Sequence, residues 1–93
     1  MEEGVRLWPN PASEGRVILS YRLPKPWSHA RMKLYTTAAR VVKSIALGDL
    51  AVGEGRLVVD LRDDAGKPLA NGIYYFVLFT DAGRYGAKLL VLR

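Results

Sequence analysis

The chain has 93 residues, of which 49% are hydrophobic and 25% are charged, and it carries a formal net charge of +5. These values indicate one globular domain that buries a two-layer core, and they exclude a disordered chain. The sequence contains no cysteine, which excludes disulfides and cysteine-ligated metals. Its longest apolar run, from Ile73 to Phe79, is too short to cross a bilayer, so we expect no membrane insertion.

Alternation of apolar and polar residues with a period of two runs through most of the chain, and no window keeps a helical repeat. Turn signals rich in Pro, Gly, Asn and Asp separate the alternating segments. Seven short strands with this spacing predict an all-β sandwich. In chain order, the predicted strands are residues 4–8, 16–23, 30–35, 40–47, 56–60, 73–80 and 84–92.

One face of each predicted strand is expected to point into the sandwich. A register slip of one residue would turn a whole set of side chains outward, so the alternation decides which residues form the core. The predicted inward residues are Val17, Leu19, Tyr21, Leu23, Met32, Leu34, Leu57, Val59, Tyr74, Phe76, Leu78, Leu89 and Val91.

The sixth predicted strand opens with Gly72-Ile73-Tyr74, directly after a polar turn rich in Asp, Gly and Pro. In β-sandwiches, a tyrosine at this place commonly donates a hydrogen bond from its hydroxyl to backbone a few residues upstream, which closes a corner of the sandwich. We therefore expect the Tyr74 hydroxyl to bond to the turn that precedes it.

The 14 Lys and Arg residues are spread singly along the chain. A nucleic-acid-binding surface typically shows a cluster of basic residues with interleaved aromatics, and no such cluster stands out here. Most of the basic residues alternate with apolar ones, as they do on the solvated face of an antiparallel sheet. We therefore predict a solvated basic surface and no nucleic-acid partner.

The sequence offers no group of residues for catalysis. Its single histidine, His29, follows Ser28, but neighbours on an extended backbone point in opposite directions and do not form a nucleophile with its base. Asp60, Asp63 and Asp64 lack the spacing of an EF-hand loop, and Asp residues before a Gly more often form Asx turns. We predict no catalytic, cofactor-binding or metal-ligating residue, and therefore no enzyme and no cofactor.

Three aromatic residues have rings that could contact a ligand. Exposed aromatic rings stack on sugars, whereas a tryptophan in a β-sandwich usually fills one end of the core. Trp8, between Leu7 and Pro9, fits packing better than exposure. Trp27 lies in a proline-containing loop, where a side chain packed under the loop and an exposed ring that stacks on a ligand are equally good interpretations. Trp27 and Tyr35 are therefore the candidate ligand aromatics of a carbohydrate-binding module.

The strand after Gly72 is apolar on both of its faces. If one half of its residues points inward, the other half points outward, where an antiparallel sheet normally carries polar residues. An exposed apolar group of this size usually marks a contact surface. Long side chains of the third strand or the N-terminal segment could instead cover it. The candidate docking face, for a partner domain or a second copy, comprises Ile73, Tyr75, Val77, Phe79, Leu90 and Leu92.

Six short motifs follow one another in a characteristic order and cover residues 7–93. Together they resemble the immunoglobulin-like domains related to the flagellar hook-capping protein, a group that includes the C-terminal sorting domains of type IX-secreted proteins. The Asp63–Tyr74 motif is the closest match. The motifs are Trp8-Pro9-Asn10-Pro11-Ala12, Leu19-Ser20-Tyr21-Arg22-Leu23-Pro24, Met32-Lys33-Leu34-Tyr35, Arg40-Val41-Val42, Asp63 to Tyr74, and Ala87 to Arg93.

Two positions depart from the pattern that this resemblance implies. The turn after the third strand has Thr36 and Ala39 where the family usually has Asp and Gly, and Val59 stands where the family often has Trp. Alanine adopts the left-handed conformation at a higher cost than glycine, so the turn is expected to differ locally. Both are packing or turn positions, so the implied fold, a seven-stranded antiparallel immunoglobulin-like β-sandwich, is expected to hold.

The resemblance implies a non-catalytic accessory domain of an exported or surface bacterial protein. Residues 1–93 are expected to be a single domain, the C-terminal module of a longer chain, that serves in sorting, attachment or assembly and binds protein partners. Residues 1–10 have neither the basic nor the apolar region of a signal peptide. The chain is therefore expected to reach the cell surface or exterior as part of a longer protein. A cytosolic interaction scaffold is the alternative.

Overall fold

The computed structural model describes residues 4–81 and 83–93. These residues form seven strands, and the part of the chain described contains no helix. The all-β prediction is therefore confirmed. The strands are β1 (Gly4–Trp8), β2 (Arg16–Leu23), β3 (Trp27–Thr36), β4 (Val41–Leu50), β5 (Gly53–Asp60), β6 (Gly72–Thr80) and β7 (Gly83–Val91).

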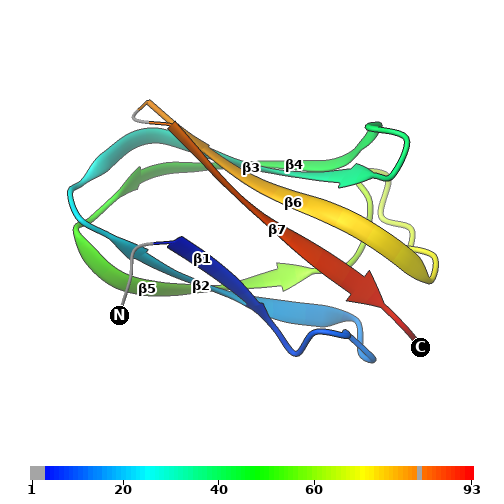
Figure 1. The fold of residues 1–93 in the computed structure, drawn as a ribbon. Helices are drawn as coiled ribbons and strands as arrows, with labels where there is room; N and C mark the ends of the chain where they lie inside the picture. The colour runs from blue at the N-terminus through cyan, green and yellow to red at the C-terminus, as the bar shows by residue number, and fades with distance from the viewer. Residues whose placement is uncertain (1–3, 82) are drawn as a thin grey trace.

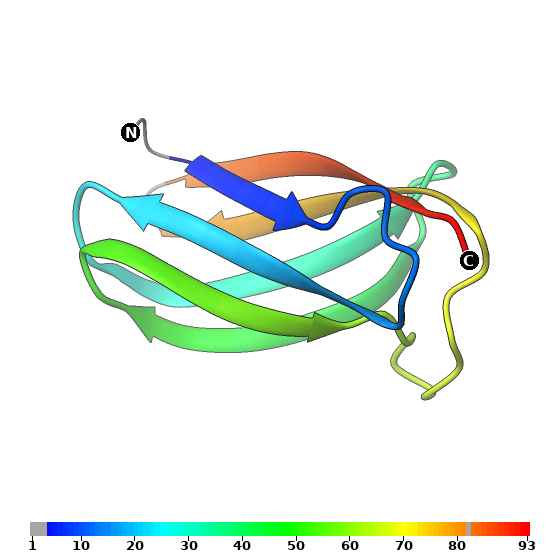
Figure 2. The same ribbon diagram turned by 90° about the horizontal axis from the view of Figure 1, so that it is seen from below.

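The strands pair antiparallel in two sheets that pack face to face (Figure 1). The three-stranded sheet has the order β1-β2-β5, and the four-stranded sheet has the order β4-β3-β6-β7. The edge strand β1 contacts the edge strand β7, which closes one side of the sandwich (Figure 2). The predicted immunoglobulin-like sandwich is confirmed in its strand number and pairing sense.

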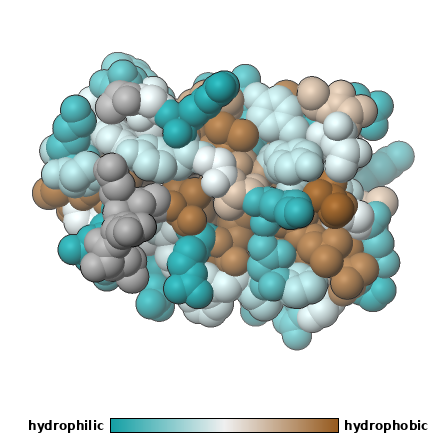
Figure 3. Space-filling model, in the orientation of Figure 1, coloured by the Kyte–Doolittle hydropathy of each residue, from teal (hydrophilic) through white to brown (hydrophobic). Residues whose placement is uncertain are grey.

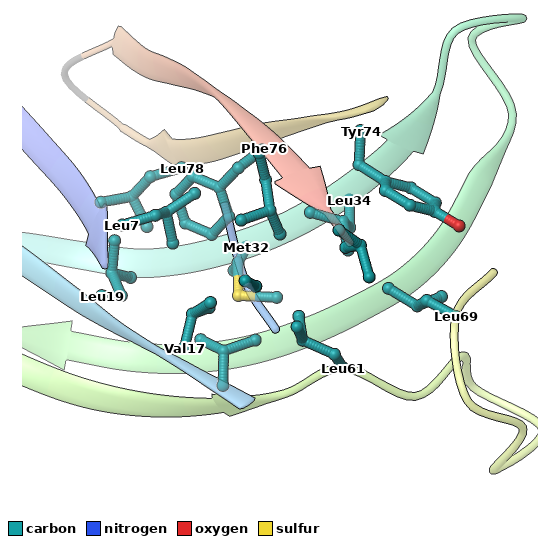
Figure 4. Close-up of a cluster of buried hydrophobic side chains, with 14 of the residues drawn as sticks. Leu7, Val17, Leu19, Met32, Leu34, Leu61, Leu69, Tyr74, Phe76 and Leu78 are labelled. Atoms are coloured by element: carbon teal, nitrogen blue, oxygen red, sulfur yellow. The ribbon is translucent and has the colours of Figure 1, made fainter. Parts of the chain in front are cut away.

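The core lies between the sheets and is built from the alternation that the sequence shows. Eleven of the thirteen predicted inward residues are buried, and the other two, Tyr21 and Leu57, are half-buried and pack against the core. Loop residues also reach the core: Leu61 and Leu69 lie among the buried side chains of the cluster that Figure 4 shows. The alternation did not predict these two because they lie outside the strands.

The strand β3 starts at Trp27, three residues earlier than predicted, and pairs with a β4 that is longer than predicted. The pairing shifts register between Trp27 and Ala30 and again between Ala30 and Arg31. His29 has a φ of 55° within the first of these irregularities. A bulge adds a residue to one strand, so the period of two is interrupted there and cannot mark the strand end. His29 lies just before the predicted strand of residues 30–35, and in the structure it is part of β3.

The predicted corner is present. The Tyr74 hydroxyl donates a hydrogen bond of 2.7 Å to the carbonyl of Ala70, and the Tyr74 side chain is buried. The bond links the start of β6 to the loop that connects β5 of the other sheet to β6. Loss of the hydroxyl would remove this partly buried hydrogen bond from the Ala70 carbonyl, which costs free energy.

Replacing Tyr74 by Phe should lower the free energy of unfolding by about 1 kcal/mol, because a single partly buried hydrogen bond is lost without a change in packing. The measurement is the denaturant midpoint of Tyr74→Phe against the parent chain. Tyr75→Phe is the matched control, since Tyr75 is exposed on the opposite face of the same strand. Equal midpoints for Tyr74→Phe and the parent would rule out a stabilising corner bond.

The turn between β3 and β4 requires one residue in the left-handed region. Ala39 has a φ of 63°, and its N–H donates to the Thr36 carbonyl at 2.9 Å. The Thr36 N–H donates in turn to the Arg40 carbonyl at 2.9 Å. This is a three-residue hairpin loop whose last residue is left-handed, the place that glycine usually takes.

Ala39→Gly should therefore raise the free energy of unfolding by about 0.5–1 kcal/mol. The left-handed conformation costs an L-residue about 1–2 kcal/mol, which exceeds the entropic cost of glycine. Ala38→Gly, at a neighbouring turn position without a positive φ, should instead destabilise the domain. Thermal or denaturant unfolding of both variants distinguishes them, and a loss of stability in both would mean that Ala39 is not left-handed in solution.

Candidate docking face

The outward residues of β6 lie side by side with those of its two neighbours. Ile73 is opposite Leu90 of β7, Tyr75 is opposite Tyr35 of β3, and Val77 is opposite Lys33. Ile73 is 42% exposed and Tyr75 is 46% exposed. The structure thus places the six residues of the candidate docking face on or beside the outer surface of β6 and β7. Val77, Phe79 and Leu90 are half-buried, and Leu92, which follows β7, is exposed.

The neighbouring side chains of β3 cover only one end of this face. The Lys33 ammonium lies 5.6 Å from the centre of the Phe79 ring, so it covers Phe79 in a cation–π contact. The Arg31 guanidinium donates to the Ser44 hydroxyl at 3.0 Å, which turns it toward β4 and away from β6. The Ile73 and Tyr75 end of the docking face therefore stays open.

The docking face is bordered by positive charge. Register places Arg31 and Lys33 of β3 on one side of β6, and Arg84 and Lys88 of β7 on the other. The outward positions of β3, β6 and β7 in these pairings include no Asp or Glu. Figure 3 shows the side of the molecule that carries β1 and β7, where hydrophilic side chains interrupt the apolar surface. The paired outward positions around the docking face thus carry basic side chains and no acidic ones.

Loop residues cover part of both edges of the four-stranded sheet. Beside β7, the Asn10 amide donates to the Lys88 carbonyl at 2.8 Å, and its oxygen accepts from the Leu90 N–H at 3.0 Å. Beside β4, the Asp64 N–H donates to the Val42 carbonyl at 3.0 Å, and its carboxylate accepts from the Ser44 N–H at 3.2 Å. Covered edges disfavour strand addition, so the face is the better place for a partner.

Sequence reasoning assigned neither Asn10 nor Asp64 this role. Asn10 is an isolated polar residue between two prolines, and this is the sequence feature that could have indicated its role at the edge of β7. For the neighbouring Asp63 the expected Asx turn is confirmed, because its carboxylate accepts from the N–H groups of Ala65 and Lys67 at 3.0 and 2.9 Å. These two carboxylates thus bind backbone.

The candidate ligand aromatics do not form a site. Trp27 is 2% exposed and stacks on Tyr85 with ring centres 5.0 Å apart, so the interpretation of Trp27 as an exposed platform is wrong. Its ring points into the core because β3 begins at Trp27. Tyr35 is half-buried on the outer face, eight residues further along the strand, which is about 26 Å away at the rise of an extended chain. A single ligand cannot contact both rings.

Trp8 also lies elsewhere than predicted. β1 turns Leu7 into the core, so Trp8 points outward from the three-stranded sheet and is 37% exposed. Its indole N–H donates to the Ser20 hydroxyl at 2.9 Å. The prediction that Trp8 packs in the core is therefore wrong, and the physical reason is the alternation of β1 itself.

The side chains of residues 4–81 and 83–93 do not form a candidate metal site. This part of the chain contains no cluster of three or more His, Cys, Asp or Glu side chains that could hold a metal ion. His29 is exposed, and the Ser28 N–H donates to the Asp81 carboxylate at 3.3 Å. Within the same described residues, no helix has the length and apolarity needed to cross a membrane.

Solved structures share this fold. FlgD from P. aeruginosa superposes with a TM-score of 0.67 and 26% identity over 97% of this chain and 67% of that chain. PorZ, described as an essential bacterial surface component of the type IX secretion system of Porphyromonas gingivalis, superposes with a TM-score of 0.66 and 17% identity. The chain spans 97% of its own length in that match but only 12% of PorZ. A comparison with curated proteins found no match.

The family model of the FlgD Ig-like domain matches residues 10–84, which is most of the chain. This match agrees with the resemblance to hook-capping and type IX secretion proteins that the motifs indicated. The strand order and the corner at Tyr74 fit such a domain. The chain therefore belongs to the family of FlgD Ig-like domains.

Proposed function

We propose that this domain is a non-catalytic assembly or attachment module that docks on a partner protein through the outer face of β6 and β7. The observation that carries this proposal is the half-exposed pair Ile73 and Tyr75 at the open end of the docking face. Exposed aromatic and aliphatic side chains next to each other are the usual centre of a protein contact.

Charge favours a different protein over a second copy. In a two-fold symmetric dimer the same patch meets itself. The four basic residues that border the docking face would then meet the same four of the second copy, with no carboxylate among the paired outward positions to separate them. Like charges brought together at an interface oppose association. The partner is therefore a protein whose own apolar patch is bordered by acidic residues.

The family supports the accessory role. FlgD Ig-like domains are structural modules, and PorZ is named as a surface component of a secretion system. We propose further that residues 1–93 act as one C-terminal module of an exported or surface protein, in sorting, attachment or assembly. The module needs no cofactor, since its task is to present a surface.

A photoreactive side chain at position 75 should form one main covalent adduct with a partner in cells of the source organism. Position 52 is the matched control, because Val52 is 58% exposed and lies outside the docking face, so random collisions would label it at least as often. The adduct from position 75 should be lost in the Val77→Lys variant, which places a fixed charge in the apolar centre. The measurement is the pattern of cross-linked bands and their mass-spectrometric identity.

Equal labelling from positions 52 and 75 would contradict the docking face. An adduct with twice the mass of the protein itself would instead support self-association and overturn the choice of a different partner. Val77 is half-buried and points outward, so its substitution should leave the fold intact, which the circular dichroism spectrum checks.

The isolated domain should be a monomer in sedimentation velocity at physiological salt, because the positive border of the docking face opposes a symmetric dimer. The double variant Lys33→Glu and Lys88→Glu adds carboxylates to that border and should weaken the cross-link from position 75, because the new carboxylates repel an acidic partner. A dimer in the parent chain that dissociates in Val77→Lys would show that the second copy is the occupant.

A further inference from the structure

A second surface with a different composition lies on the opposite sheet. It is formed by the outward residues of β1, β2 and β5, and we call it the arginine face. Register aligns Arg6 with Ser20 and Arg56 across the three strands. Toward one end of the sheet the same register aligns Arg16 with Asp60, and toward the other it aligns Arg22 with Glu54.

An apolar row crosses the middle of the arginine face. Register aligns Trp8, Ile18 and Val58 in neighbouring strands, so their side chains are adjacent. Val58 is 63% exposed, Trp8 is over a third exposed, and Ile18 is half-buried. Three adjacent outward apolar residues on a solvated sheet face are unlike the scattered exposures that need no explanation.

The Trp8 ring is held in one orientation. Its indole N–H bonds to the Ser20 hydroxyl at 2.9 Å, and the Arg56 guanidinium lies 5.7 Å from the ring centre. A ring fixed in this way loses little side-chain entropy when another chain packs on it. The row is therefore preorganised for a contact.

The arginines around the row differ in whether an acidic residue of the described part of the chain pairs with them. Arg22 is paired with Glu54 at 2.7 Å. For Arg6, Arg16 and Arg56, in contrast, no carboxylate of residues 4–81 and 83–93 lies within ion-pair distance. The planar guanidinium group of an arginine can donate two parallel hydrogen bonds to one carboxylate. These three residues are suited to bind carboxylates from another molecule.

A cavity of about 450 Å³ opens at one end of the arginine face and shares Arg16, Val58 and Asp60 with it. Two further arginines line this cavity, and backbone carbonyls orient both: Arg62 donates to Gly66 at 3.0 Å and Arg93 to Leu69 at 2.6 Å. Three arginines face two carboxylates, Glu14 and Asp60, in its lining. The cavity is positive overall and large enough for an acidic side chain.

We propose that the arginine face binds an acidic segment of a protein, with an apolar side chain of that segment on the row of Trp8, Ile18 and Val58. Carboxylates of the segment pair with Arg6, Arg16 and Arg56, and one of them enters the cavity. A nucleic acid also carries negative charge, but its phosphate backbone has no aliphatic group to cover Ile18 and Val58.

Trp8 supplies a reporter for this surface. The second tryptophan, Trp27, is buried and stacked on Tyr85, so a change in tryptophan emission on ligand addition reports on Trp8. The probe is a synthetic heptapeptide of three glutamates, one phenylalanine and three glutamates, which itself contains no tryptophan. We expect a saturable change in emission, and amide shifts in the NMR spectrum that are largest in β1, β2 and β5.

The double variant Arg16→Gln and Arg56→Gln should weaken binding of this peptide by about tenfold or more, because two charge-assisted pairs are lost. Arg40→Gln, in the turn between β3 and β4, is the matched control and should bind as the parent does. A peptide with serine in place of phenylalanine should bind more weakly, and one with lysines in place of the glutamates should not bind. Gln keeps the side-chain stem, so both variants should retain the parent's spectrum.

Three results with the peptide would overturn the proposal: no saturable change in emission, equal binding by the Arg16→Gln and Arg56→Gln variant, or amide shifts confined to β6 and β7. Tighter binding of a single-stranded oligonucleotide of equal charge would overturn it in favour of a nucleic-acid surface. The arginine face lies on the opposite sheet from the docking face, so either surface can fail its test while the other passes.

Discussion

The register of β6 is the constraint on which both the core and the docking face depend. β6 lies inside the four-stranded sheet, between β3 and β7. Among the described strands, it is the one that is apolar on both of its sides. The hydrogen bond from Tyr74 to Ala70 sets where β6 begins. A slip of one residue would exchange Phe76 and Leu78 for Val77 and Phe79 in the core, and would move Lys33 and Lys88 relative to the apolar residues.

Protection of both edges of the four-stranded sheet leaves its outer face as the better surface for contact. Asn10 and Asp64 come from loops at distant points of the chain, and each satisfies one N–H and one C=O of an edge strand. Ala12 extends this cover along β7 through bonds with Leu90 and Leu92. Exposed edges invite pairing with other chains, so this cover favours contacts made by side chains over contacts made by backbone.

The two outer faces are both basic, but their chemistry differs. The docking face has an open apolar end, with lysine and arginine along its sides and no carboxylate among its paired positions. The arginine face has a narrow apolar row, no lysine among its paired outward positions, and carboxylates at both ends. Basic side chains thus lie on two surfaces on opposite sheets.

The fold class and most of the core could be predicted from the sequence because alternation is a local pattern. In a strand, residues i and i+2 share a face, so eleven inward residues follow from their neighbours alone. The corner at Tyr74 was predictable for the same reason, since its partner lies four residues upstream. The apolar outer side of β6 is likewise visible in the sequence as a strand with no polar side.

Properties that depend on which strands are neighbours could not be predicted in this way. The lysines and arginines that border the docking face come from β3 and β7, and the sequence does not state that these strands flank β6. The position of Trp27 depended on a bulge that interrupts the alternation, and the row of Trp8, Ile18 and Val58 depended on the register of three strands. The sequence by itself determined the strands and their inward sides, because backbone geometry is local. Only the tertiary structure decided which charges and apolar side chains meet on a common surface, because strand pairing joins residues that are far apart in the chain.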